Sequence, residues 1–187
     1  STDPVEVNRI ASELDLLNRE RQGIEAQAVL EAEAEMDRAL TLDPDKPVLV
    51  TASATWHPGV VGLVAARLKE RFGRPAFAFA LRPDGTATGS GRSVAGVDLG
   101  FAVREAVNAG LLVKGGGHAM AAGATLPGHD PRLFGEFLAT ALAAAVAEAR
   151  AVEALLIDGT VSAGGATAEV VRLVQRAGPF GAGAPEP

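Results

Sequence analysis

Two short glycine-rich segments near the middle of the chain carry the side chains best suited to phosphate chemistry. Residues 115–118 read Gly-Gly-Gly-His, and residues 89–93 read Gly-Ser-Gly-Arg-Ser. Glycine lets a ligand approach the backbone closely, a guanidinium can hold two phosphate oxygens at once, and hydroxyls add donors. Either segment alone is more often a turn or a place of close strand packing. Their combination predicts two anion-binding loops.

Three side chains that could bind phosphate each have a second interpretation: His57, Arg92 and His118. His57 precedes a predicted helix, so it either lies beside an anion at the helix N-terminus or only caps that helix. Arg92 either binds phosphate or forms a surface salt bridge. His118 either assists catalysis as a proton donor or is a buried ring bonded to a carbonyl. The candidate phosphate-binding residues are His57, Ser90, Gly91, Arg92, Ser93, Gly115, Gly116, Gly117 and His118.

Several chemistries are excluded by what the chain lacks. It has no cysteine, which excludes disulfides, thiolate zinc sites and cysteine nucleophiles. His57, His118 and His129 show neither helical i,i+4 spacing nor an associated carboxylate cluster, so no complete metal site is expected within this chain. The patterns of a dinucleotide-binding fold, a P-loop and a hydrolase nucleophile elbow are also missing. No bound cofactor is therefore expected for this chain.

Charge is distributed unevenly along the sequence. The formal net charge is −6, which by itself argues against a nucleic-acid partner. Residues 47–118, however, hold 8 Lys/Arg against 4 Asp/Glu, whereas residues 1–46 hold 5 against 12 and residues 119–187 hold 4 against 7. The one positive block contains both glycine-rich segments.

The elements that must position these residues alternate between helix and strand. Asp3 and Pro4 form a helix start, and the break around residues 42–47 ends that long helix. Gly73 followed by Pro75 marks the end of another helix. The sequence predicts an α/β fold with a mixed β-sheet flanked by helices and preceded by a long connecting helix. The expected strands are residues 47–52, 76–81, 86–91, 121–126 and 155–161, and the expected later helices are residues 58–72, 98–109, 131–150 and 166–177.

Length and hydropathy set the broad class of protein. The 187 residues are 48% hydrophobic, enough for one domain with a core plus appendages. The sequence shows neither a run of membrane-spanning length nor a signal-peptide pattern, so we expect no membrane partner and a cytoplasmic location. The start at Ser1 and the turn-rich end predict a fragment of a longer protein.

Residues 115–123, Gly-Gly-Gly-His-Ala-Met-Ala-Ala-Gly, resemble the signature of the DHH-associated domain, which accompanies the Asp-His-His catalytic domain of a phosphoesterase superfamily. Further blocks, in this order, resemble the RecJ-type family of single-strand-specific 5′ to 3′ DNA exonucleases. Together the blocks span most of the chain, from residue 16 to residue 183, and are highly specific. They are residues 16–22, 56–62, 89–93 and 179–183.

The resemblance implies a division of labour. An upstream domain would hold Mn²⁺ or Mg²⁺, and this chain would clamp single-stranded DNA for it, in a protein of DNA repair and recombination. Ser90 and Arg92 would bind the 5′ phosphate or the backbone, and His118 would face the scissile phosphate. Residues 1–44 would be the connecting helix, residues 45–150 the DHH-associated domain, and residues 151–187 a linker and the start of a truncated oligonucleotide-binding fold.

Two departures from the family pattern accompany the resemblance. The chain lacks the Asp-His-His motif, so the partner catalytic domain is missing and the fragment alone is expected to be inactive. Ala184 stands where the family commonly has asparagine. Two alternatives stay open: a fragment of a phosphoesterase for oligoribonucleotides or nucleotide bisphosphates, and a non-catalytic module that docks a partner protein through residues 1–42.

Overall fold

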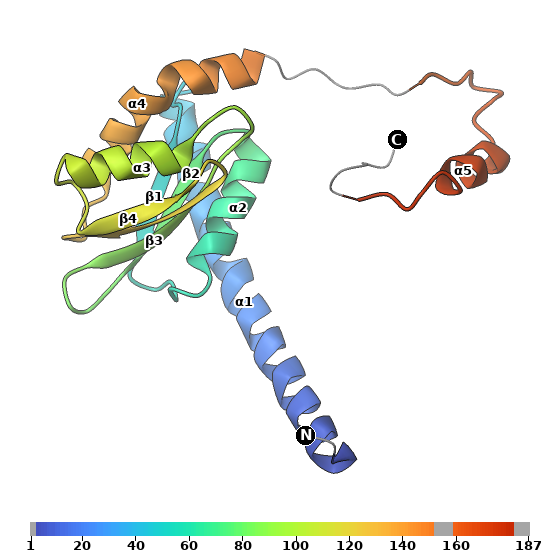
Figure 1. Cartoon of the computed structure of the whole chain (residues 1–187), viewed down its shortest axis with the longest axis horizontal. Helices are drawn as coiled ribbons and strands as arrows, with labels where there is room; N and C mark the ends of the chain where they lie inside the picture. Colours follow the sequence, from blue (N-terminus) through green and yellow to red (C-terminus); the bar gives the residue numbers. More distant parts are fainter. Residues whose placement is uncertain (1–2, 152–158, 182–187) are drawn as a thin grey trace. The chain divides into compact units, whose positions relative to one another are not determined.

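The computed structural model describes residues 3–151 and 159–181. Within them, five strands form one mixed sheet in the order β1-β2-β3-β5-β4 (Figure 1). β1 and β2 are parallel, and the other neighbours are antiparallel. The strands are β1 (Leu49–Ser53), β2 (Ala76–Leu81), β3 (Ala87–Arg92), β4 (Lys114–His118) and β5 (Ala121–Leu126). The predicted α/β class with a mixed sheet is confirmed.

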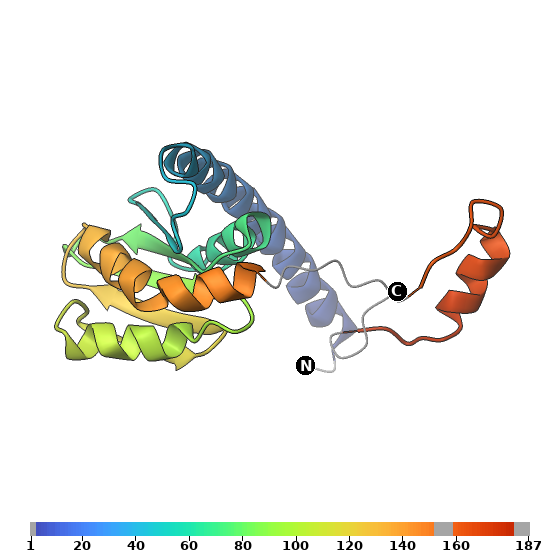
Figure 2. The same ribbon diagram turned by 90° about the horizontal axis from the view of Figure 1, so that it is seen from above.

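Helices cover the two faces of this sheet in pairs (Figure 2). The long helix α1 (Pro4–Leu42) and α2 (Val61–Phe72) lie on one face, and α3 (Leu99–Asn108) and α4 (Arg132–Ala151) lie on the other. Each pair buries its own apolar cluster against the strands. α1 and α2 cover β1, β2 and β3, whereas α3 reaches β4 and β5. Two packed layers of helix therefore leave one side of β4 and β5 without a helix.

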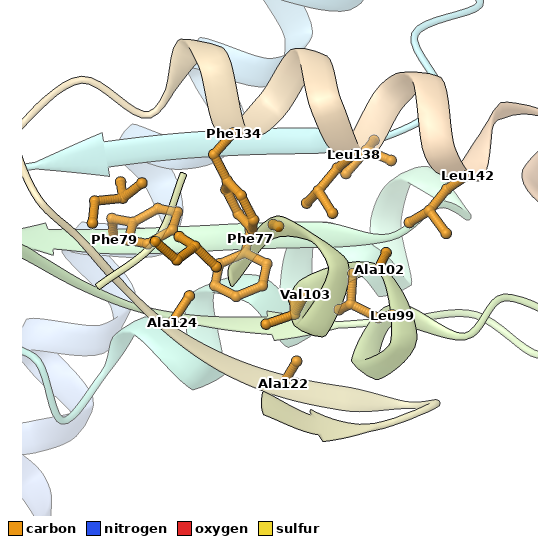
Figure 3. Packing of buried hydrophobic residues seen from close by; sticks show 14 of the residues in the cluster. Phe77, Phe79, Leu99, Ala102, Val103, Ala122, Ala124, Phe134, Leu138 and Leu142 are labelled. Atoms are coloured by element: carbon orange, nitrogen blue, oxygen red, sulfur yellow. The ribbon is translucent and has the colours of Figure 1, made fainter. Parts of the chain in front are cut away.

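Alternation along β2 and β3 explains the glycines of the second motif. Phe77 and Phe79 point to the α3–α4 side, where Phe134 meets both rings edge-on at 5.1 and 5.8 Å between centroids (Figure 3). Gly89 and Gly91 lie directly opposite these two phenylalanines in β3. A methyl group on either glycine would lie only 2.3 to 2.5 Å from a ring carbon. These glycines therefore make room for the aromatic core.

The glycines of the first motif form a strand, which corrects the expectation of two anion-binding loops. Residues 114–118 are the edge strand β4, and residues 89–92 belong to the central strand β3. Since β3 pairs on both sides, the two ladders occupy its backbone amides. Gly115 and Gly117 allow close packing, because a Cβ at either position would meet an atom at 2.7 or 2.3 Å. These two glycines therefore serve strand packing.

The first helix divides into a packed half and an exposed half. Asp3 caps it by accepting a hydrogen bond from the Val5 amide, with Pro4 in the first turn, as the sequence predicts. The stripe at residues 7, 10, 14, 17 and 24 is exposed, whereas Ala28, Ala32 and Met36 are buried. α1 thus leaves the sheet and extends away from it (Figure 1).

Most other boundaries match the sequence within one to three residues. Gly73 ends α2 with φ of 62°, as its place before Pro75 predicts. α2 begins at Val61 instead of residue 58, because residues 57–60 form a turn closed by the hydrogen bond from Val60 to His57. The predicted strand at residues 155–161 lies largely outside the described residues, and residues 159–161 are not in a strand.

A second unit of the chain contains a short helix. α5 (Ala168–Gln175) is capped by Thr167, whose hydroxyl oxygen accepts a hydrogen bond from the Val170 amide. In the described part of the chain, no helix has the length and hydropathy that a membrane span requires.

Candidate functional site

The polar residues of both motifs lie on one face of the sheet, which we call the open face: no described helix covers it over β4 and β5, and α2 covers it in part over β3. On β4 these are Lys114 and His118, with Gly116 between them, because alternate residues of a strand share a face. Register places His118, Ala121 and Arg92 in one row, and Gly116, Gly123 and Ser90 in the next. With strands about 4.8 Å apart, the backbones of His118 and Arg92 lie about 10 Å from each other.

Arg92 and Ser90 lie beside the first turn of α2. A Cβ on Gly62 would lie 3.1 Å from a terminal guanidinium nitrogen of Arg92 and 3.7 Å from the Ser90 hydroxyl oxygen. Gly62 therefore admits the guanidinium, which also donates to the Gly91 carbonyl at 2.9 Å. No hydrogen bond of the described residues occupies the amides of Val61 and Gly62. Free amides at a helix N-terminus, a guanidinium and a hydroxyl together suit a phosphate.

His118 ends β4 and is exposed, so the interpretation of a buried ring bonded to a carbonyl does not hold. Two backbone hydrogen bonds fix the hairpin turn that follows. The Leu99 amide donates to the Ala119 carbonyl, and the Ser93 amide donates to the Met120 carbonyl. Arg104 of α3 donates to the Gly117 carbonyl at 3.2 Å. The His118 imidazole thus lies at the end of a hairpin that these hydrogen bonds fix, on the same face of the sheet as Arg92.

Ser93 does not belong to this open face. It is buried, and its hydroxyl donates to the Val97 carbonyl at 2.7 Å. That contact closes the turn between β3 and α3, so the side chain is occupied. Gly91 likewise points into the core, where a Cβ would meet Phe77 and Leu99. Neither residue offers a side chain, or space for one, to a ligand. The Gly91 carbonyl accepts a hydrogen bond from the Arg92 guanidinium.

His57 lies in the turn before α2, away from the row that joins His118 and Arg92. Its Nδ1 accepts a hydrogen bond from the Gly59 amide at 3.0 Å, so the ring closes the turn that leads into the helix. It lines a hollow of its own with Arg82 and Pro83. The capping interpretation of His57 therefore describes its contacts.

A divalent metal does not fit the side chains of this face. The described residues contain no group of three or more His, Cys, Asp or Glu side chains that can hold an ion. Mg²⁺ and Mn²⁺ require several oxygen ligands, and the open face of β3, β5 and β4 offers hydroxyls, a lysine, an arginine and a histidine instead. This face is suited to an anion.

The motifs do not include three residues of the open face. Lys114, Thr125 and Thr88 share one row of the register at the far end of the strands from Arg92. A strand assignment for residues 114–118 predicts Lys114 on this face, because alternate residues of a strand share a face and Lys114 alternates with Gly116 and His118.

The chain matches known proteins over its whole length. Residues 45–149 match the model of the DHHA1 domain. The chain is 39% identical over 192 residues to the single-stranded-DNA-specific exonuclease RecJ of Salmonella typhimurium, an alignment that covers 97% of this chain and 32% of that protein. This chain thus spans about a third of the length of that relative.

Solved structures agree with the sequence match. RecJ of Thermus thermophilus in complex with Mg²⁺ superposes with a TM-score of 0.70 at 31% identity, covering all of this chain and 28% of that chain. The Mn²⁺ complex of the same protein gives 0.66 at 32% identity, covering all of this chain and 26% of that one. The chain belongs to the DHHA1 domain family and corresponds to the DHHA1-containing part of the RecJ exonucleases.

Proposed function

We propose that this chain is the strand-binding part of a single-stranded-DNA-specific 5′ to 3′ exonuclease. The observation that carries the proposal is the grouping of Arg92, Ser90 and the free first-turn amides of α2 at one end of an open sheet face. Such a set of donors binds a phosphate through charge-assisted hydrogen bonds. The relatives of this chain are named as single-stranded-DNA-specific exonucleases, so we take the ligand to be a phosphate of single-stranded DNA.

His118 has a positioning role in this proposal. It lies in the same row as Arg92, about 10 Å away across two strand spacings. An imidazole on the same face can donate a hydrogen bond to another phosphodiester of the strand that Arg92 holds. Hydrolysis belongs to a metal-bearing catalytic domain outside this chain, and Mg²⁺ or Mn²⁺ is expected there.

The exposed stripe of α1 fits a connecting helix. Residues 7, 10, 14, 17 and 24 follow spacings of three and four with a gap at Arg21, and all five apolar side chains are exposed. Because burial of such a stripe is favourable, we expect the catalytic domain to pack against this side of α1. The same stripe favours the alternative of a protein-docking module, for which DNA binding is not required.

The test is direct binding of a 5′-phosphorylated single-stranded octanucleotide at low salt. The Arg92→Ala variant is expected to bind at least tenfold more weakly, since a hydrogen bond to a charged group contributes about 1.5–3 kcal/mol. The matched control is Arg38→Ala, which removes the same charge from the exposed surface of α1. The strand should stay intact when Mn²⁺ is added.

Two results would contradict the proposal. One is equal affinity of wild type and Arg92→Ala for the phosphorylated strand. The other is cleavage of the strand by this chain alone that persists after repurification and disappears in the Arg92→Ala variant, because hydrolysis would then need no further domain.

A further inference from the structure

The open face continues past Ser90 to a second polar row. Lys114 of β4 pairs with Thr125 of β5, and Thr125 pairs with Thr88 of β3. These three side chains lie on the same face as Gly116, Gly123 and Ser90, because on each strand the two positions are separated by two residues. From Arg92 to Thr88 is four residues, or about 14 Å along an antiparallel strand.

The second row borders a hollow in the surface. The hollow has a volume of about 360 Å³, and its lining includes Lys114, Thr125 and Thr88 together with Gly116 and Gly123. A Cβ on Gly116 would meet nothing within 4 Å, and one on Gly123 would meet only a carbonyl at 3.9 Å. A ligand backbone can therefore lie directly on the strands between the two polar rows.

The charges on this face all have one sign. Of its nine residues on β3, β5 and β4, Arg92 and Lys114 are cationic and none is acidic. Lys114 is exposed, and within the described residues it makes no ion pair or hydrogen bond. Its ammonium group is therefore available to an anion that enters the hollow.

We propose that Lys114, with the hydroxyls of Thr88 and Thr125, forms a second phosphate subsite for the backbone of a single strand. This inference rests on the proposed function, because it takes the first phosphate to be held at Arg92. The subsite then contacts a phosphodiester further along the same strand. The 14 Å between the backbones of Arg92 and Thr88 is roughly four times the 3.4 Å phosphate spacing along one strand of duplex DNA. A 5′-phosphorylated dinucleotide carries only neighbouring phosphates, so we expect one held at Arg92 to make no contact with Lys114.

The experiment compares two ligands and three variants of the full chain. The ligands are a 5′-phosphorylated dinucleotide and a 5′-phosphorylated octanucleotide, both single-stranded DNA. The variants are Lys114→Gln, Arg92→Ala and, as the matched control, Lys46→Gln. Lys46 precedes β1, at the opposite edge of the sheet from β4. Affinities are measured by fluorescence anisotropy between 20 and 200 mM salt, values chosen on the order of those that resolve counterion release.

Lys114→Gln is expected to weaken octanucleotide binding by at least threefold at the lowest salt and to leave dinucleotide binding unchanged. Its plot of log affinity against log salt should be shallower by about 0.7, the value for one phosphate contact with a single strand. Arg92→Ala should weaken the binding of both ligands. Lys46→Gln should change neither.

The outcomes separate the subsite from the proposed function. If Lys114→Gln binds the octanucleotide like wild type while Arg92→Ala does not, the subsite is refuted and the proposed function stands. If Lys114→Gln weakens both ligands equally, its charge acts at long range and the subsite is also refuted. If wild type binds no octanucleotide, the proposed function fails and the subsite fails with it.

Discussion

Gly91 and Gly116 stand in similar glycine-rich motifs, but their surroundings are opposite. A Cβ at Gly91 would lie 2.5 Å from two carbons of the Phe77 ring, whereas a Cβ at Gly116 would meet nothing within 4 Å. Gly91 faces the core between β3 and α3, and Gly116 faces the open side of β4. The same residue type thus makes room for the core at one position and leaves open space above the strand at the other.

Substituting each glycine by alanine should separate these two roles. Gly91→Ala is expected to destabilise the fold by about 1–3 kcal/mol, because the methyl group overpacks the core. Gly116→Ala should stay within about 0.5 kcal/mol of wild type, because its methyl group would meet no atom within 4 Å. Its methyl group should nevertheless weaken octanucleotide binding. Urea unfolding and anisotropy measure the two effects, and equal loss of stability in both variants would contradict the assignment.

Among the elements, α1 is held by polar contacts to α2 and to the turn before it, as well as by its buried alanines. Glu31 accepts hydrogen bonds from the Trp56 indole N–H at 3.0 Å and from the Gln27 amide at 2.8 Å. Arg71 of α2 binds Glu33 and Asp37 of α1. These contacts hold the C-terminal half of α1 beside α2, and they position the turn that contains Trp56 and His57.

The Glu31 contact should respond to acid. The hydrogen bond from Gln27, followed by that from Trp56, lowers the pKa of Glu31 below its ordinary value of 4.5. A carboxyl group with a lowered pKa in the folded state stabilises the fold above pH 4.5, and this contribution is lost as the pH falls through the lowered pKa. Trp56 is the single tryptophan of the chain, so its fluorescence should shift in that range.

The matched variants for the acid response are Glu31→Gln and Glu13→Gln. Glu31→Gln cannot titrate at this position, so its tryptophan emission should lose the acid-dependent shift. Glu13 lies on the exposed half of α1, where its substitution should leave the shift intact. An unchanged pH profile in Glu31→Gln would show that Trp56 does not sense this carboxyl group.

Local signals in the sequence locate most elements. The strand at residues 76–81 follows from a short continuous apolar run, and the helix end at Gly73 follows from a glycine that adopts positive φ. For β4 the same signals favour a loop, because glycine has low strand propensity. It forms a strand because α3 packs closely upon it, and Gly100 is the position at which this approach needs space. Such a contact depends on residues far apart in the sequence.

The candidate site is predictable in part for the same reason. The motifs identify Ser90, Arg92 and His118, which register does bring to one face. They also include Ser93 and Gly91, which the structure turns into the core. Only the pairing of β3, β5 and β4 separates the two groups, since neighbours along a strand point to opposite sides.

At the scale of the whole molecule, charge and hydropathy are segregated. The one positive block, residues 47–118, supplies the cations of the open face, whereas residues 1–46 are acidic and carry the exposed apolar stripe of α1. The acidic helix will repel a nucleic acid, so its stripe is suited to contact with protein. The proposed function therefore assigns different partners to two parts of the chain: single-stranded DNA to the sheet and a protein surface to α1.

An isolated chain should satisfy the apolar stripe by self-association. Leu14 and Leu17 are 60% and 52% exposed, and a second copy of the stripe is the apolar surface available to them in a pure sample. Sedimentation velocity should show a coefficient that rises with concentration. Leu14→Glu with Leu17→Glu should remain monomeric, because two charges then interrupt the stripe. The control adds the same charges on the opposite side of α1, as Asn8→Glu with Ser12→Glu, and it should associate like wild type. If the control dissociates as well, net charge governs the association and the stripe does not.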